Sequence, residues 1–231
     1  MRVDELAKTL DHTVLRAGTT VADVERACGE ARDLHVAALC SFPAFVPLMA
    51  DRLRGSDVKV CTVVSFPFGL DGPEAKVCAA EQAVKAGAEE IDVVMNVSAL
   101  LSGQPTQARD ELVRVVRAAR RTAGMSGRGE VIVKAIVEAP LLGEPLTRLA
   151  CKIVADAGCD FAKTCTGVGT AADPRDVEVM RDALPAAVAV KAAGGIRTAD
   201  DAVVMLEAGA SRIGTSAAPQ ILGAVRAGTP V

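Results

Sequence analysis

Six charged side chains interrupt apolar stretches of this sequence, where a folded chain is expected to bury its residues. Burying an unpaired ammonium group is costly, and a buried lysine commonly responds with a lowered pKa. A lysine that loses its proton can attack a carbonyl carbon, and a second ammonium group nearby favours that loss. Together, the six residues indicate Schiff-base chemistry in which the carboxylates transfer protons. Any one of them, taken alone, could instead belong to a structural ion pair. The six residues are Asp11, Asp92, Lys134, Glu138, Lys163 and Lys191.

Three turns rich in glycine and hydroxyl groups follow apolar stretches in the second half of the chain. Glycine lets backbone amides approach an anion closely, and the loops after the last strands of a barrel commonly bind phosphate. Three such turns favour a phosphate site over three simple tight turns. The residues expected to bind phosphate are Thr166, Gly167, Gly194, Gly195, Gly214 and Ser216.

Lys163 and Lys134 compete for the role of nucleophile. Lys163 lies just before the first glycine turn, which favours it. Lys134 lies inside an apolar run, and the two-residue period of a strand places Ile136 and Glu138 on its face. Lys134 is therefore either the nucleophile or a structural partner of Glu138, and both interpretations stay open at this point.

Eight apolar runs of strand length recur along the chain, and helix signals separate them. Their nearly continuous hydrophobicity is typical of parallel strands covered on both faces. Thr20 and Thr198 begin capping boxes, and Asp173 precedes a proline at a predicted first helical position. The alternation predicts one α/β domain over residues 1–231, a TIM (β/α)8 barrel with its chemistry at the carboxyl ends of the strands. The predicted strands span residues 9–13, 36–40, 58–66, 90–96, 131–138, 160–166, 188–193 and 212–216.

The composition excludes several classes of function. The 231 residues carry 26 basic and 29 acidic side chains, for a net charge of −3, and only 2% are aromatic. Nucleic acid is not an expected partner, because a phosphate backbone requires a basic excess and stacked bases require aromatic platforms. No uncharged run is long enough to span a bilayer, and the acidic N-terminus lacks the apolar core of a secretory signal. We therefore expect a cytoplasmic protein that binds no membrane.

The cysteines and histidines do not form a metal motif. Seven cysteines are scattered without a CxxC pair, and the chain has two histidines. Because zinc sites need closely spaced ligands, we expect no metal and no other cofactor. We also expect the thiols to be reduced, as is usual in the cytoplasm.

Six motifs together resemble deoxyribose-phosphate aldolase, in that family's order and across nearly the whole chain. They are LDHT at 10–13, VSFPFG at 64–69, EIDVVMN at 90–96, KTCTG at 163–167, VKAAGGIR at 190–197 and RIGTS at 212–216. The two lysine motifs near the C-terminus are highly specific as a pair. The resemblance implies a metal-free class I aldolase that reversibly cleaves 2-deoxy-D-ribose 5-phosphate to D-glyceraldehyde 3-phosphate and acetaldehyde. It is also compatible with a homodimer.

Carried over by motif, the resemblance implies a role for each interior charge. Lys163 would form the Schiff base, and Lys191 would be the cationic neighbour that favours its neutral form. Asp92 would be the general acid/base, acting with an ordered water. Asp11 would organise the lysine–carboxylate network. The three glycine turns would bind the substrate phosphate, largely through backbone amides.

Several positions depart from the family's pattern, and two of them concern the site. Cys165 stands where serine is usual, and we expect a tolerated small residue there. Ala217 stands where the family tends to have a serine, so one hydroxyl for the phosphate is missing. That loss concerns affinity and not the type of reaction.

Two other functions compete with this one. The first is a Schiff-base aldolase that uses a different donor or acceptor, because the glycine turns do not specify the chain length of a phosphorylated substrate. The second is a catalytically silent barrel that binds a sugar phosphate. The presence of Lys163, Lys191 and Asp92 argues against the silent barrel.

Overall fold

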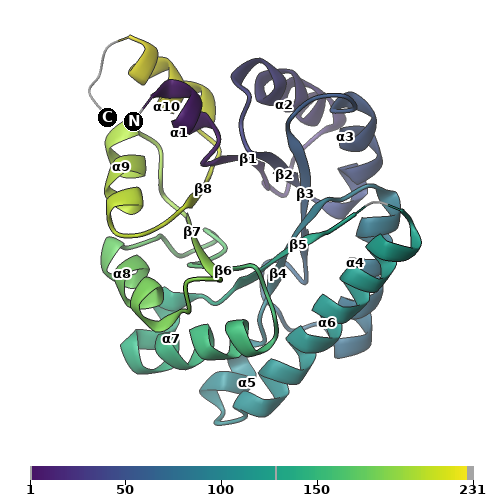
Figure 1. The fold of residues 1–231 in the computed structure, drawn as a ribbon, viewed down its shortest axis with the longest axis vertical. Helices are drawn as coiled ribbons and strands as arrows, with labels where there is room; N and C mark the ends of the chain where they lie inside the picture. Colours follow the sequence, from purple (N-terminus) through teal and green to yellow (C-terminus); the bar gives the residue numbers. More distant parts are fainter. Residues whose placement is uncertain (1, 128, 228–231) are drawn as a thin grey trace.

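Eight parallel strands close into a barrel, which confirms the predicted (β/α)8 fold (Figure 1). The computed structural model describes residues 2–127 and 129–227. The strands are β1 (Leu10–Val14), β2 (Ala38–Ser41), β3 (Lys59–Val64), β4 (Glu90–Val94), β5 (Ile132–Ile136), β6 (Phe161–Lys163), β7 (Ala189–Ala193) and β8 (Arg212–Thr215). Each strand pairs with the next in chain order, and β8 pairs with β1 to close the barrel.

Helices connect the strands and cover the outside of the barrel (Figure 1). They are α1 (Val3–Ala7), α2 (Val21–Leu34), α3 (Val46–Arg52), α4 (Pro73–Ala86), α5 (Val97–Leu101), α6 (Pro105–Met125), α7 (Ala139–Asp156), α8 (Pro174–Ala183), α9 (Ala199–Glu207) and α10 (Ala218–Arg226), with a 3₁₀ turn at Pro43–Phe45. The capping boxes predicted at Thr20 and Thr198 begin α2 and α9, and the Asp173 side chain caps α8. In the described residues, no helix is long and apolar enough to cross a membrane.

Five predicted strands are too long at their carboxyl ends, among them β4, which ends two residues early at Val94, and β8, which ends one residue early at Thr215. β3 ends at Val64 because Ser65 adopts a left-handed backbone with φ 57°, and such a residue cannot continue a strand. β5 ends at Ile136, two residues before Glu138, which has φ 54°. β6 ends at Lys163, three residues earlier than predicted. These early ends leave more chain in the loops at that end of the barrel.

The alternation of side chains along each strand separates an apolar outer face from a charged interior. In β4, Ile91 and Val93 belong to the hydrophobic core that the helices cover. Glu90 and Asp92, on the opposite face, form ion pairs with Lys134 of β5 inside the barrel. The barrel interior is therefore not a simple apolar core.

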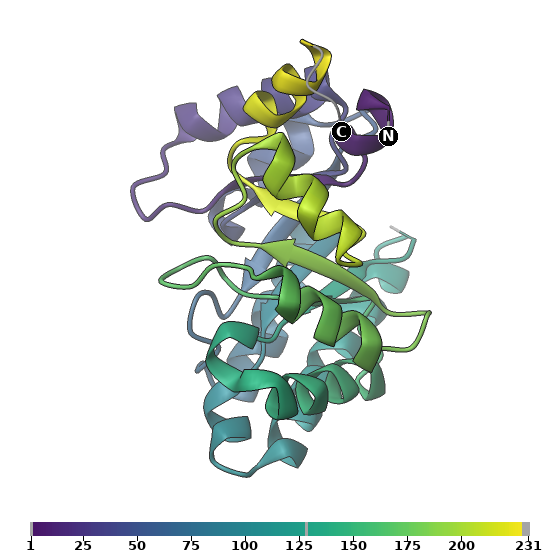
Figure 2. The same cartoon turned by 90° about the vertical axis from the view of Figure 1, so that its left-hand side faces the viewer.

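The loops that follow the strands gather at one end of the barrel. In Figure 2 the loops after β1 (purple) and β6 (green) project to the left, the side to which the arrowheads of β7 and β8 point. In (β/α)8 barrels, this carboxyl end of the strands is where binding and catalytic groups lie.

Candidate active site

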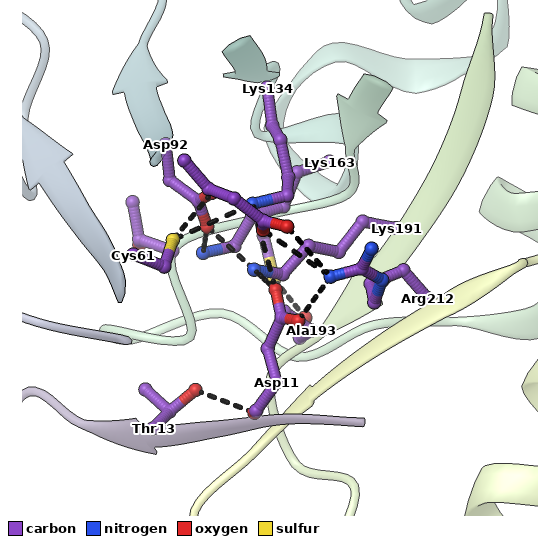
Figure 3. Close-up of polar contacts among 12 residues, drawn as sticks. Asp11, Thr13, Cys61, Asp92, Lys134, Lys163, Lys191, Ala193 and Arg212 are labelled. Carbon is purple, nitrogen blue, oxygen red and sulfur yellow. Dashed lines mark hydrogen bonds and ion pairs between the residues drawn. The ribbon is translucent and has the colours of Figure 1, made fainter. Parts of the chain in front are cut away.

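Asp92 lies at the centre of three lysines inside the barrel (Figure 3). Its Oδ1 accepts a hydrogen bond from the Lys134 Nζ at 2.9 Å. Its Oδ2 accepts from the Nζ atoms of Lys163 at 2.9 Å and Lys191 at 2.7 Å. Asp92 is on β4, and the lysines are on β5, β6 and β7, so neighbouring strands bring the predicted interior charges to one point. All four residues are buried, with Lys163 the most exposed at 3%.

A second layer of charges lies toward the amino ends of the strands. Asp11 on β1 accepts from the Lys191 Nζ at 2.5 Å and from the Arg212 Nη1 at 2.7 Å. The Glu90 Oε2 lies 2.5 Å from the Lys134 Nζ and 3.3 Å from the Arg212 Nη1. With Asp92 and Lys163, the described cluster holds three carboxylates and four cations. One lysine can therefore lose its proton and leave the cluster's charges balanced.

The ion pairs decide which of these groups stay charged. Burial by itself raises the pKa of Asp92, but the three lysines outweigh it and hold that pKa well below its usual range. Asp11 follows the same pattern, and its cationic neighbours lower its pKa to about 2. Burial by itself lowers the pKa values of Lys134 and Lys191, but the neighbouring carboxylates outweigh it and raise both. Lys134 and Lys191 therefore stay protonated and positively charged.

The depressed carboxylate pKa values predict a loss of stability in acid. The pKa of an unfolded aspartate is about 3.9, so near pH 3 the unfolded chain binds protons that the folded chain excludes. The stabilisation is complete above about pH 5 and is lost as the pH falls toward the folded pKa of Asp11, which is about 2. Between pH 5 and pH 3, we expect the free energy of unfolding in urea to fall by about 1 kcal/mol from this residue alone. The Asp11→Asn variant should show a smaller fall between pH 5 and pH 3, and an equal fall in both proteins contradicts the prediction.

Lys163 differs from the other two lysines in its access and its partners. It is the one lysine of the described cluster that lines a cavity of about 620 Å³ at the carboxyl end of the barrel. Its Nζ has one carboxylate partner, whereas Lys134 has three within 4 Å and Lys191 has two. In the register of β5 with β6, Lys163 pairs with Ile136, two residues nearer the carboxyl end than Lys134. Loss of a proton from Lys163 therefore disrupts the fewest ion pairs and presents a free amine to the cavity.

The predicted phosphate turns line the same cavity. The residues of this set are Thr166, Gly167, Gly194, Gly195, Gly214 and Ser216. Within the described residues, the amides of Gly195 and Ser216 have no hydrogen-bond acceptor, so both are free to bind an anion. The Thr166 amide is different, because it donates to the Glu138 Oε1 at 2.5 Å. Only the hydroxyl of Thr166 can therefore donate to a ligand.

Glycine is required at two of these positions because the turns pack closely. Gly167 has φ 78° and Gly194 has φ 101°. A Cβ on Gly194 would lie 2.8 Å from the Cys165 Sγ and 3.2 Å from the Gly167 Cα, so a side chain there would push the turns apart. Gly214 has a different reason, since a Cβ there would lie 3.2 Å from the Lys191 Cε. This glycine leaves room for the cation.

The interpretation of Glu138 as a partner of Lys134 is wrong. The carboxylate of Glu138 turns to the loop after β6, where it accepts from the Thr166 amide and, at 3.0 Å, from the Thr170 hydroxyl. The left-handed backbone of Glu138 ends the strand, so the two-residue alternation that suggested the pair does not extend to it. Glu138 shapes the loop that carries the first phosphate turn.

Cys165 is a structural thiol in this fold. Its Sγ donates to the Ala193 carbonyl oxygen at 2.9 Å, and the side chain is fully buried. Burial raises its pKa above the usual value. Cys165 does not line the cavity, which supports its interpretation as a tolerated small residue.

Several charged residues of the site were not among those expected from the sequence. Glu90 and Arg212 complete the buried cluster, and each is the first residue of its strand. A charge two residues before Asp92 on the same strand was a signal for Glu90. Arg16 and Arg197 line the cavity from the loops after β1 and β7. Loop arginines are common on protein surfaces, so their types alone gave no signal.

Among the described residues, two sets of buried ligands could geometrically surround a metal ion. They are Cys40, Cys61 and Asp92, and Asp11, Cys61 and Glu90, each with its ligand atoms within 4.8 Å of one another. The three carboxylates already bind ammonium groups at 2.5–2.9 Å, and a metal cation would have to displace them. Burial also raises the pKa of Cys61 well above its usual value, so the thiol stays protonated. The electrostatics of the cluster thus disfavour a metal, and metal independence stays a prediction.

Comparison with known proteins identifies relatives across the whole barrel. Residues 6–224 match the model of the DeoC/LacD family aldolases. The chain is 44% identical over 220 residues to a deoxyribose-phosphate aldolase from Micrococcus luteus, which covers 95% of this chain and 96% of that protein. A deoxyribose-phosphate aldolase from a Thermoanaerobacter species is 43% identical over 218 residues, or 94% of this chain and 95% of that one.

Solved structures show the same relationship. The tetrameric deoxyribose phosphate aldolase from Aeropyrum pernix has a TM-score of 0.88 and 33% identity to this chain. That match covers 97% of this chain and 92% of the other. Both the sequence and the fold are thus shared over nearly their full length. The chain belongs to the DeoC/LacD family of aldolases.

Proposed function

We propose that this protein is a class I aldolase that reversibly cleaves 2-deoxy-D-ribose 5-phosphate to D-glyceraldehyde 3-phosphate and acetaldehyde. The observation that carries the proposal is the environment of Lys163. This lysine has a single carboxylate partner and lines a cavity that it shares with three glycine turns. A nucleophilic amine beside an anion site matches an aldehyde substrate that carries a phosphate. Membership of the aldolase family supports the same reaction.

Lys163 is the nucleophile of the proposed mechanism. Its neutral Nζ attacks the C1 aldehyde carbon of the open-chain sugar, and the carbonyl oxygen takes up a proton. Loss of water gives a protonated imine, which withdraws electrons from the bond between C2 and C3. Removal of the C3 hydroxyl proton breaks that bond, releases D-glyceraldehyde 3-phosphate and leaves an enamine on Lys163. Protonation of the enamine carbon and addition of water then release acetaldehyde.

Asp92 and Lys191 control proton transfer during these reaction steps. The Asp92 Oδ2 accepts from both Lys163 and Lys191, so a proton leaving the nucleophile has an acceptor within 2.9 Å. An ordered water beside Asp92 carries protons to and from the substrate carbon. Lys191 keeps its charge because Asp11 and Asp92 raise its pKa, so the nucleophile has a permanent cation as its neighbour on the same Asp92 oxygen. Asp11 thus acts through Lys191 as a positioning residue.

The glycine turns bind the substrate phosphate. The free amides of Gly195 and Ser216 point to backbone recognition, supported by the Ser216 and Thr166 hydroxyls. Arg197 lines the cavity just after the second turn and adds a positive charge. These groups hold the sugar so that its aldehyde end reaches Lys163.

Two measurements on the intact protein test the proposal. The first is release of acetaldehyde from 2-deoxy-D-ribose 5-phosphate, and the second is trapping of acetaldehyde by a mild hydride donor followed by mass spectrometry. We expect cleavage of the sugar phosphate and an ethyl adduct that the substrate competes away. An adduct without cleavage indicates a Schiff-base aldolase for another substrate. The absence of both indicates a silent sugar-phosphate barrel.

The assembly and location of the protein are part of the same proposal. A homodimer is the proposed assembly, and the Aeropyrum pernix relative is described as tetrameric, so sedimentation analysis must distinguish the two. The seven cysteines are free thiols in the structure, six of them buried, which supports the proposed cytoplasmic location.

A further inference from the structure

We infer that Arg16, in the loop after β1, binds the phosphate group of the substrate and determines the preference for phosphorylated over unphosphorylated sugars. The inference rests on the proposed function and adds a specificity-determining residue to the site. Arg16 lies outside every motif that carried the resemblance, and it comes to the site only through the closure of the barrel.

The cavity contains two arginines whose guanidinium groups form no ion pair in the described part of the chain. Apart from His12, which contacts Glu30, four basic side chains line it, and two of these are paired: Arg26 lies 2.5 Å from Asp23, and Lys163 is bound to Asp92. The other two are Arg16 and Arg197, and neither guanidinium group forms an ion pair within 4 Å among the described residues, although the Arg197 backbone amide donates to the Asp201 carboxylate at 2.9 Å. Unpaired guanidinium groups in a cavity attract anions, and their planar geometry suits a phosphate.

The closed barrel places the two arginines on opposite sides of the last phosphate turn. β8 lies between β7 and β1, with Asp11 of β1 paired to Gly214 of β8. The turn after β8, which contains Ser216, is therefore flanked by the loop that holds Arg197 and the loop that holds Arg16. Figure 2 shows the loop after β1 projecting at the same end as the loop after β6.

The turns themselves supply few additional donors. Ala217 has no hydroxyl, and its amide is already bound to the Thr215 Oγ1 at 2.9 Å. In the loop after β6, the apolar Val168 lines the cavity, and its amide is bound to the Thr166 Oγ1 at 3.2 Å. A phosphate with close to two negative charges thus needs a further cation.

The backbone at Arg16 is held in place while its side chain is free. The carbonyl of Arg16 accepts from the Thr19 amide at 2.9 Å, which closes the turn before α2. The side chain is exposed and forms no hydrogen bond within the described part of the chain. Because its backbone is fixed and its guanidinium has no partner, Arg16 can bind a phosphate without breaking another interaction.

The test compares two substrates across two matched variants. Arg16→Met removes the guanidinium and keeps an apolar stem, and Arg32→Met makes the same charge change outside the cavity. Arg32 is exposed in the last turn of α2 and has no carboxylate partner in the described residues. The substrates are 2-deoxy-D-ribose 5-phosphate and unphosphorylated 2-deoxy-D-ribose.

We expect Arg16→Met to raise KM for the phosphorylated sugar about tenfold, the effect of one charge-assisted hydrogen bond, with kcat within about twofold. The value of kcat/KM for the unphosphorylated sugar should not change, and Arg32→Met should leave both substrates unaffected. Added salt screens exposed charges, so the preference for the phosphorylated sugar should fall with ionic strength more in the unmodified protein than in Arg16→Met.

Four results overturn the inference. Equal losses on both substrates mean that Arg16 does not recognise the phosphate, and equal effects of Arg16→Met and Arg32→Met mean that only net charge matters. If the unmodified protein is active and Arg16→Met keeps the same KM, the inference is wrong and the proposed function stands. If the unmodified protein cleaves neither sugar, the proposed function fails and the inference fails with it.

Discussion

Replacing Lys163 by methionine is expected to reduce kcat/KM for 2-deoxy-D-ribose 5-phosphate by about 10⁴-fold or more, because no covalent intermediate can form. Methionine keeps an unbranched side chain of similar length and removes the amine. Lys163 has only one carboxylate partner, so its loss takes a cation from one carboxylate, whereas loss of Lys134 takes a cation from three. The measurement is steady-state cleavage together with hydride trapping of acetaldehyde, and both signals should disappear while the protein stays folded.

Lys134→Met is the matched control, since it removes another buried lysine amine from the same cluster. Lys134 lies within 4 Å of Asp11, Glu90 and Asp92, so its loss leaves three carboxylates short of a cation. We expect a fall of about 3–5 kcal/mol in the free energy of unfolding, with the adduct still on Lys163 in the protein that remains folded. An adduct that maps to Lys134, or that survives in Lys163→Met, contradicts the assignment of the nucleophile.

The strands of this fold were predictable because each is a continuous apolar run between helix signals. Their ends were less predictable, because they depend on contacts made only in the folded barrel. Glu138 ends β5 in a left-handed conformation while its carboxylate holds the Thr166 amide, 28 residues further along the chain. No local pattern around Glu138 contains that information.

The buried cluster was predictable in its members and not in its pairs. A charge inside an apolar strand is unusual enough to be noticed, which identified Asp11, Asp92 and the three lysines. Which inward side chains share a layer depends on the register and stagger of the closed barrel. That stagger brings Lys191 of β7 to Asp11 of β1, and it separates Lys134 from the cavity while Lys163 reaches it.

Asp92→Asn is expected to separate nucleophile formation from proton transfer. The amide cannot act as a general acid/base, so turnover of the sugar phosphate should fall by about 10²–10⁴-fold. Three lysines lose their shared carboxylate, which should lower the free energy of unfolding by about 3–5 kcal/mol. The variant keeps the Lys163 amine in the lining of the cavity, where acetaldehyde can reach it. Hydride trapping of acetaldehyde on Lys163 should therefore persist in this variant although turnover is lost.

Glu90→Gln also replaces a carboxylate of the cluster by an amide, but at a position away from Lys163. Comparing it with Asp92→Asn therefore shows whether the position of the carboxylate matters for turnover. Glu90 pairs with Lys134 and Arg212 and does not contact Lys163, so this variant should be destabilised in a similar way but keep most of its turnover. Unfolding in urea and kcat/KM, measured on both variants, distinguish the two effects. If both variants lose turnover in proportion to their stability, Asp92 is only a structural counter-charge. If Asp92→Asn loses stability but keeps its turnover, another group moves the protons, and the water beside Asp92 is not part of the path.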